Sequence, residues 1–218
     1  TGLIGGSIGM ALRARRWHVT GHDQSNFNAQ HARERGAIDE IGLDDRASIC
    51  FLAMPVSGIS SDGRRVLEET DWVVTDVGSV KGPIVAALDS PRFVGGHPMA
   101  GSEQDGIQGS SASMFEGAVW VLTPTATTDP KAQAMVHSVV ASFGADVITL
   151  DAAVHDQFVA MVSHVPHLTA ATLMGLAGQR STQEGRGALL RLAAGGFRDM
   201  TRIASGSPYI WPDICGDN

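Results

Sequence analysis

The chain has 218 residues, of which 43% are hydrophobic and 18% are charged, and its formal net charge is −7. This composition is typical of a globular protein with one or two packed domains, and it excludes a largely disordered chain. The negative charge argues against nucleic acid or an anionic membrane as a partner, and no apolar run approaches the roughly 18 residues of a membrane span.

The cysteine and histidine spacings predict neither a disulfide framework nor a metal site. Cys50 and Cys215 lie far apart, and Cys50 falls in an apolar stretch, which favours a reducing, cytoplasmic setting. His164 and His167 are close in sequence, but no third or fourth ligand accompanies them.

The chain starts within a glycine-rich turn. Gly2-Leu3-Ile4-Gly5 matches the last four positions of Gly-x-Gly-x-x-Gly, the turn that brings backbone amides close to a dinucleotide pyrophosphate. The helix expected over residues 6–15 points its positive end at the phosphates. A plain junction between a loop and a helix gives the same pattern. Because no strand stands before this turn, we expect the first strand and the first glycine of the motif to precede Thr1.

An acidic residue completes the dinucleotide pattern. Residues 17–22 predict a strand that ends at Asp23, where a carboxylate binds a ribose 2′-hydroxyl and repels a 2′-phosphate. Asp23 therefore predicts NAD rather than NADP as the cofactor. The alternative is that Asp23 is the N-cap of the polar helix that ends near Gly36.

Strands and helices then alternate. Apolar runs predict strands at residues 47–53, 71–76, 92–94, 118–122 and 146–150, and helical spacing predicts helices at 57–70, 82–88 and 130–143. This alternation predicts a Rossmann-type, doubly wound parallel α/β sheet, with its first strand missing from this sequence.

In such a sheet the ligand binds beyond the carboxyl ends of the strands. Met54-Pro55, Ser79 and His97 are each expected just past a strand end, and they should share one edge with Gly2 and Asp23. The predicted cofactor-binding residues are accordingly Gly2, Leu3, Ile4, Gly5, Asp23, Met54, Pro55 and Ser79.

The stretch Gly95-Gly96-His97-Pro98-Met99-Ala100-Gly101-Ser102-Glu103 gathers an imidazole, a hydroxyl and a carboxylate between glycines and a proline. A histidine held in this way is a candidate general base near neutral pH. A surface turn with a solvated histidine is the alternative, and the expected position of His97 at the ligand edge favours the base.

The pattern changes after residue 150. Apolar residues fall at helical spacing from residue 151, over 165–177 and over 188–193, with a polar link at 179–187 and a further polar-decorated segment from 196 to 204. We therefore expect a dinucleotide-binding domain over residues 1–150 and an all-helical domain over residues 151–218.

Five ordered motifs carry a family resemblance. Gly-Leu-Ile-Gly-Gly-Ser at 2–7, Asp-Val-Gly-Ser-Val-Lys at 76–81, the histidine motif at 95–103, Ser-His-Val-Pro-His at 163–167 and Gly-Phe-Arg-Asp-Met-Thr-Arg-Ile-Ala at 196–204 occur together. Across essentially its whole length the chain resembles the prephenate and arogenate dehydrogenase family of tyrosine biosynthesis. The resemblance implies a helical dimerisation domain after the Rossmann-type domain, and a homodimer when the protein is full length.

The resemblance also implies an NAD-dependent oxidative decarboxylation of prephenate to 4-hydroxyphenylpyruvate. In this reaction His97 accepts the proton of the ring hydroxyl while hydride leaves the ring, and Ser79 orients the hydroxyl and the histidine. Arg202 receives a substrate carboxylate from across the cleft, and His167 faces the substrate. His164 is expected to pack within the helices, although the roles of the two histidines could be exchanged.

Further residues are candidates for the substrate pocket. Ser102, Glu103 and Trp211 are implied to line the substrate pocket, although Glu103 fits a solvated turn and Trp211 a core position equally well. His155 and His137 are expected to be ordinary surface or helix residues.

Departures from the family pattern leave alternatives open. The first strand is missing, and the sequence stops before the long helices that normally complete the dimer, so we expect a protein of these residues alone to be unstable or inactive. Arogenate as the substrate, giving tyrosine directly, and an inactive NAD-binding fragment are the alternative interpretations.

Overall fold

The structure is a computed structural model that describes residues 1–102, 104, 106–183, 188–206 and 208–218. Contacts within the chain group these residues into two units, one formed by Thr1–Asp156 with Tyr209–Asn218 and the other by Gln157–Pro208.

The first unit contains the strands and most of the helices. Its strands are β1 (Thr20–Gly21), β2 (Glu40–Ile41), β3 (Ile49–Leu52), β4 (Val73–Asp76), β5 (Phe93–Pro98), β6 (Val119–Thr123) and β7 (Asp146–Thr149). Its helices are α1 (Leu3–Ala14), α2 (Asn26–Glu34), α3 (Val56–Glu69), α4 (Gly82–Ala87), the 3₁₀ turn η1 (Ile107–Gly109), α5 (Pro130–Ser142) and α10 (Trp211–Asp217). A further 3₁₀ turn, η4 (Pro208–Ile210), precedes α10, and α6 (Ala152–Val159) begins in this unit.

The main sheet has the order β3-β4-β5-β6-β7, and β1 and β2 form a separate parallel pair. The expected α/β architecture is confirmed, with β3, β4 and β5 parallel to one another. The expectation that every strand is parallel is wrong, because β6 runs antiparallel to β5 while β7 is parallel to β6. The physical reason lies in the connection from β5 to β6, whose described part contains turns and η1 but lacks the crossover helix that a parallel return needs.

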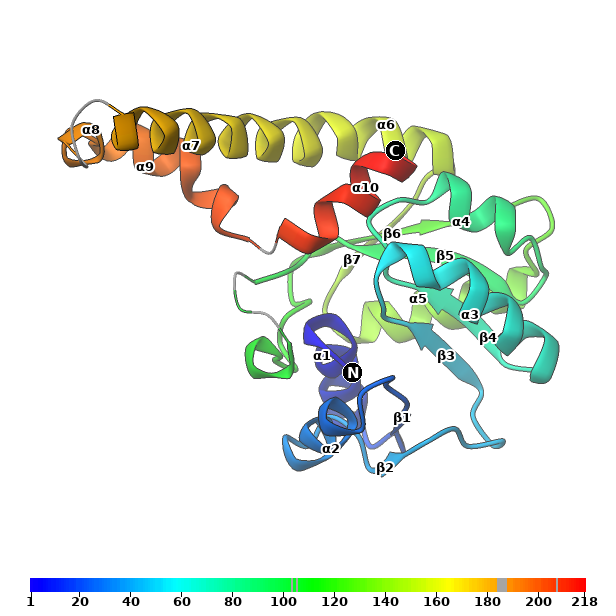
Figure 1. The fold of residues 1–218 in the computed structure, drawn as a ribbon. Helices are drawn as coiled ribbons and strands as arrows, with labels where there is room; N and C mark the ends of the chain where they lie inside the picture. The colour runs from blue at the N-terminus through cyan, green and yellow to red at the C-terminus, as the bar shows by residue number, and fades with distance from the viewer. Residues whose placement is uncertain (103, 105, 184–187, 207) are drawn as a thin grey trace. The chain divides into compact units, whose positions relative to one another are not determined.

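Helices lie on both faces of this sheet, as a doubly wound fold requires (Figure 1), and apolar side chains form a cluster on each face. Neighbouring residues of β5 point to opposite faces, so Phe93 joins a cluster with α3 and α4 while Val94 joins a cluster with α1 and α5. Alternation along the strand thus builds two cores, and the strand ends between them are held by packing on both sides.

Local sequence rules set several helix starts. Asp129 accepts the backbone N–H of Lys131 at the start of α5, with Pro130 in the first turn, and the Asp151 carboxylate accepts the N–H of Ala153 at the start of α6. The Ser25 hydroxyl accepts the N–H of Asn28 and is the N-cap of α2. The alternative role of Asp23 as that N-cap is therefore wrong.

The second unit is entirely helical in its described residues. It contains the end of α6, a π-helical turn η2 (Ala160–His164), α7 (Val165–Gln183), α8 (Ala188–Arg191), α9 (Gly195–Thr201) and the 3₁₀ turn η3 (Arg202–Ser205). The expected polar link over 179–187 is wrong in its first half, because α7 continues to Gln183 through residues that favour helix, such as Gln179 and Arg180.

One helical stretch bears on membrane insertion. Ala152–Ser181 has a mean hydropathy of 1.3 over its most apolar window, of which 22% is buried, and is long and apolar enough to cross a membrane. The expectation that no run approaches this length is therefore wrong. A single such helix is weak evidence for a span, because the core helix of a soluble protein and a signal sequence pass the same test.

Candidate active site

The glycine turn forms the first turn of α1. Gly2 is the N-cap residue, and its carbonyl accepts the N–H of Gly6 at 2.8 Å. A Cβ at Gly5 would lie 3.1 Å from the Cβ of Ala53, so this position needs a small residue because α1 approaches the segment that follows β3. The same contact places the start of α1, with Leu3, Ile4 and Gly5, beside the end of β3, the edge strand of the main sheet.

Asp23 lies next to this turn. Its Oδ2 accepts the Thr1 hydroxyl at 2.8 Å, and its Oδ1 accepts the backbone N–H of Ser25 at 2.9 Å. The structure therefore brings the predicted acidic residue to the residue that precedes Gly2. Local hydrogen bonds therefore anchor the Asp23 carboxylate.

The candidates that follow β3 and β4 lie at one edge of the sheet. Met54 and Pro55 come directly after β3, where Pro55 is the N-cap residue of α3. Ser79 is half-buried in the loop between β4 and α4. Because β3, β4 and β5 are parallel, their carboxyl ends share this edge.

His97 lies inside β5, opposite Val121 of β6, and is 9% exposed. The expectation that it follows the strand end is wrong, because the antiparallel ladder with β6 continues to the pair of Pro98 and Trp120. Its place near the carboxyl end of β5 nevertheless keeps His97 at the edge of the sheet that carries the other candidates. A histidine in a paired strand has a fixed backbone, which a turn would not provide.

The ring of His97 contacts a second buried histidine. Its Nδ1 lies 2.8 Å from Nε2 of His155, and Nδ1 of His155 lies 2.7 Å from Oδ1 of Asp156. His155 lies in α6, as the expectation of a helix residue has it, but it is 1% exposed, so the alternative of a surface residue is wrong. Sequence reasoning missed His155 and Asp156, and the available signal was an adjacent histidine and aspartate one turn after the helix start at Asp151.

A buried ion pair supports the same edge. Lys81 and Asp76 are fully buried and in contact, and Nζ of Lys81 also donates to the Gly96 carbonyl at 2.8 Å. Asp76 in turn accepts the N–H of Gly96 at 3.0 Å and of Gly78 at 2.8 Å. These bonds join the end of β4 to β5 beside His97. They also give a structural reason for the aspartate and the lysine at the two ends of the motif at 76–81.

The candidates in the second unit have varied environments. His167 on α7 is 8% exposed and His164 in η2 is 6% exposed. Burial lowers the pKa of His167, which a hydrogen bond to the backbone of Ile203 partly offsets. That bond brings His167 next to η3, which begins with the exposed Arg202.

The last candidates lie elsewhere in the chain. Ser102 is exposed and its hydroxyl accepts the N–H of Gln104 at 3.1 Å, whereas Glu103 lies outside the described residues. Trp211 is half-buried at the start of α10, in the first unit.

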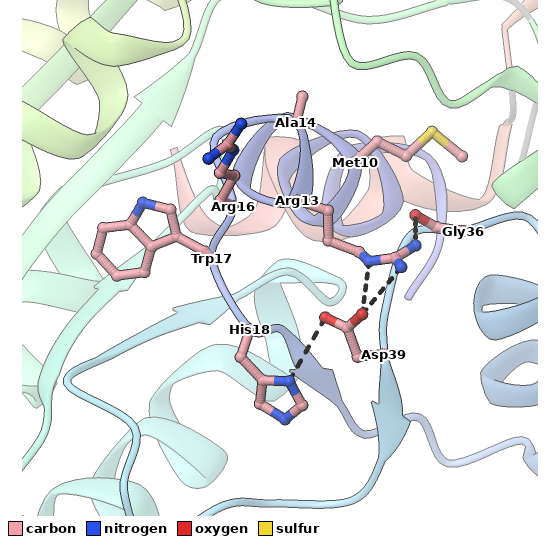
Figure 2. A pocket seen from close by; sticks show the side chains of 8 residues that line it. All are labelled: Met10, Arg13, Ala14, Arg16, Trp17, His18, Gly36 and Asp39. Atoms are coloured by element: carbon pink, nitrogen blue, oxygen red, sulfur yellow. Dashed lines mark hydrogen bonds and ion pairs between the residues drawn. The ribbon is translucent and has the colours of Figure 1, made fainter.

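A hollow of about 600 Å³ lies at the other end of α1, away from the glycine turn. Figure 2 shows Asp39 between the guanidinium of Arg13 and the ring of His18. Arg13 also donates to the Gly36 carbonyl at 2.6 Å. These contacts join the end of α1 to the segment before β2, so the hollow is a feature of the α1 packing rather than part of the candidate site.

Comparisons with known proteins assign this arrangement to a family. Residues 8–149 match the nucleotide-binding domain of prephenate dehydrogenase, and residues 151–218 match its dimerisation domain. The chain is 35% identical to prephenate dehydrogenase of Bacillus subtilis (strain 168) over 230 residues, which cover 98% of this chain and 61% of that relative. It thus spans less than two thirds of that relative's length.

Solved structures give the same result. The crystal structure of prephenate dehydrogenase from A. aeolicus, in complex with hydroxyphenyl propionate and NAD+, is similar with a TM-score of 0.90 and 34% identity, over 98% of this chain and 78% of that one. Synechocystis arogenate dehydrogenase is similar with a TM-score of 0.81 and 34% identity, over 99% and 80% of the two chains. The chain belongs to the prephenate dehydrogenase family.

Proposed function

We propose that the protein oxidises and decarboxylates prephenate with NAD, giving 4-hydroxyphenylpyruvate and CO₂. The observation that carries this proposal is the buried His97 at the carboxyl edge of the sheet, where the glycine turn also meets the end of β3. The family assignment and the NAD+ named with the A. aeolicus structure support it.

The residues at this edge fit a dinucleotide. Gly2 and Gly5 leave the start of α1 without side chains, so phosphate oxygens can approach its backbone amides. The anchored Asp23 carboxylate suits a free ribose hydroxyl and disfavours a phosphorylated one, and Met54, Pro55 and Ser79 supply further contacts. When bound, the nicotinamide ring supplies a hydride acceptor.

His97 performs the proton transfer. Its neutral imidazole takes the proton of the ring hydroxyl at C4 as the C–H bond at the same carbon breaks, so a carbonyl begins to form there. Loss of the ring carboxylate as CO₂ then makes the ring aromatic, which provides the driving force, and the phenolate oxygen that results takes the proton back from His97. Ser79 holds the hydroxyl and the imidazole in position.

Prephenate carries two carboxylates, and cations must receive them. We assign this role to Arg202, whose planar guanidinium can bind a carboxylate through two parallel hydrogen bonds. His167 contributes a neutral hydrogen-bonding group, because burial keeps its pKa low. We also assign substrate binding to Ser102, Glu103 and Trp211, as the family resemblance implies.

Arogenate is the second candidate substrate, supported by the similarity to Synechocystis arogenate dehydrogenase. A steady-state assay of prephenate and arogenate, each with NAD and NADP, separates the possibilities. We expect the highest kcat/KM for prephenate with NAD. A higher kcat/KM for arogenate would reverse the substrate order, and binding of NAD without oxidation of either substrate would favour an inactive nucleotide-binding protein.

We also propose a cytoplasmic homodimer in which the Gln157–Pro208 unit contacts a second copy. This unit matches the dimerisation domain and exposes large apolar side chains, with Met161 70%, Val162 68% and Leu192 84% exposed. Covering them with a second copy removes apolar area from water, which favours association. Sedimentation equilibrium should give twice the chain mass, and a monomer at micromolar concentration would contradict the proposal.

A further inference from the structure

His97, His155 and Asp156 form one line of ring and carboxylate contacts within the first unit. The distances are 2.8 Å from His97 Nδ1 to His155 Nε2 and 2.7 Å from His155 Nδ1 to Asp156 Oδ1. The two rings meet edge to face at 74°. All three residues are at most 9% exposed, so water does not compete strongly for these bonds.

The Asp156 carboxylate is held by backbone donors. Oδ1 accepts the N–H of Lys81 at 2.8 Å, and Oδ2 accepts the N–H of Gly82 at 2.7 Å. Burial raises the pKa of Asp156, but the hydrogen bonds from His155, Gly82 and Lys81 outweigh that effect and lower it overall. Both oxygens are therefore acceptors, and the group is ionised at neutral pH.

The Asp156 carboxylate determines which ring nitrogen of His155 and of His97 carries the proton. An ionised Asp156 can only accept, so Nδ1 of His155 carries a proton. Neutral His155 then has its lone pair on Nε2, so Nδ1 of His97 must donate to it. Neutral His97 therefore has its lone pair on Nε2, the ring nitrogen that faces away from His155.

We propose that His155 and Asp156 are positioning residues that hold His97 in the tautomer with a basic Nε2. This inference rests on the proposed function, in which that nitrogen takes the hydroxyl proton of the substrate. After the transfer His97 is an imidazolium, and its Nδ1–H bond to His155 couples the new positive charge to the Asp156 carboxylate. Lys81 and Asp76, which lie beside these three residues in the described part of the chain, form an ion pair with each other.

The tautomer of His97 can be measured without an activity assay. Imidazole ¹⁵N chemical shifts of the whole protein should show His97 protonated at Nδ1 and unprotonated at Nε2 near pH 8. His155→Phe keeps an aromatic ring but offers no acceptor, so His97 should shift to the Nε2–H form. His155→Gln still offers a carbonyl acceptor and should keep the Nδ1–H form.

Both variants lose the coupling to Asp156. We expect the pKa of His97, measured by the same ¹⁵N titration, to fall by about one pH unit in each of them, because the nearby opposite charge no longer acts through His155. His137→Gln, a change of an exposed histidine in the same unit, is the matched control and should leave the spectrum of His97 unchanged.

Kinetics give a second readout. In His155→Phe, kcat should fall about 100-fold with little change in the KM for prephenate, and His155→Gln should recover part of that loss. The acidic limb of the pH profile of kcat/KM should move to lower pH in both variants. Unchanged kcat and an unchanged His97 tautomer in His155→Phe would overturn the proposal.

Failure of the proposed positioning role of His155 and Asp156, here called the relay, can be distinguished from failure of the proposed function. If neither prephenate nor arogenate is oxidised but the ¹⁵N pattern is as expected, the proposed function falls and the relay stands. If substrate is oxidised but His97 of the unmodified protein is protonated at Nε2, the relay falls. The latter measurement decides even if both His155 variants fail to fold.

Discussion

Two histidine–aspartate pairs in the first unit have the same residue types and different surroundings. His155 and Asp156 are 2.7 Å apart, with side chains 1% and 12% exposed. His18 and Asp39 are 3.7 Å apart beside the hollow of Figure 2, with side chains 47% and 27% exposed. In the buried pair His155 also contacts His97. In the exposed pair Asp39 instead accepts hydrogen bonds from the Arg13 side chain and from the N–H of Val19.

The difference shows what burial adds to a pair of titratable groups. At the surface, water and salt compensate for a lost partner, so the pair contributes little and fixes no tautomer. In the interior each donor needs an acceptor. The Asp156 carboxylate therefore determines which ring nitrogen carries the proton in His155 and, through it, in His97. The predictions below test this contrast between interior and surface.

Replacing the buried histidine at the end of the line should have the largest effect. His97→Asn should keep NAD binding but lower kcat for prephenate by roughly 10²–10⁴-fold, because the general base is lost. The control His18→Asn, at the exposed pair, should leave kcat within a factor of two or so. Near-normal turnover by His97→Asn would remove this residue from the mechanism.

Removing one member of the buried ion pair should have the largest effect on stability. Lys81→Met leaves the Asp76 charge without its cation, and we expect a loss of about 3–5 kcal/mol in the free energy of unfolding. Arg65→Met breaks the exposed pair with Asp62 and should cost less than about 1 kcal/mol. Urea denaturation of both variants measures the difference, and equal losses would refute the contrast.

Glycine positions offer a smaller test. A Cβ at Gly9 would lie 2.2 Å from the carbonyl oxygen of Ala37, so Gly9→Ala should force α1 away from that segment and cost about 1–3 kcal/mol. A Cβ at Gly58 in α3 would make only an ordinary 3.6 Å contact with Met54. Gly58→Ala should therefore gain up to about 1 kcal/mol from helix propensity, and thermal melts should shift in opposite directions.

The smallest expected effect is a pH dependence of stability. Burial lowers the pKa of His167 in the folded protein below its usual value of about 6.5, so the unfolded chain binds this proton first. The associated stability is complete above about pH 6.5 and is lost as the pH falls toward the folded-state pKa. His167→Gln should show a smaller loss of urea midpoint between pH 7.5 and pH 5.5 than the unmodified protein. An equal loss in both would contradict the assignment.

Much of the fold follows from local patterns. Apolar runs and helical spacing predicted the strands β3–β7 and the helices α3–α5, because each of these elements has apolar residues that pack against one of the two clusters, and these residues recur at the strand or helix period. The reversal of β6 was not predictable in this way, because a strand has the same pattern in either direction. The direction depends on the path of the connection around η1, which periodicity does not describe.

The candidate site likewise has features that local sequence patterns predict and long-range contacts that they do not. Glycines beside a helix start and an acid after a short strand are local signals, and Gly5 does lie in the first turn of α1 and Asp23 does follow β1. The contact of His155 with His97 joins residues 58 positions apart, so no spacing rule contains it. Lys81 was predicted only as part of a motif, and its burial against Asp76 became visible only once β4 and β5 were paired.

The most direct test of the central claim is the stoichiometry of products from prephenate and NAD+. NADH absorbance, 4-hydroxyphenylpyruvate and released CO₂ should appear in equal amounts with the unmodified protein, and all three should be lost together in His97→Asn. Release of CO₂ without NADH, or equal product formation by His97→Asn, would contradict oxidative decarboxylation with His97 as the base.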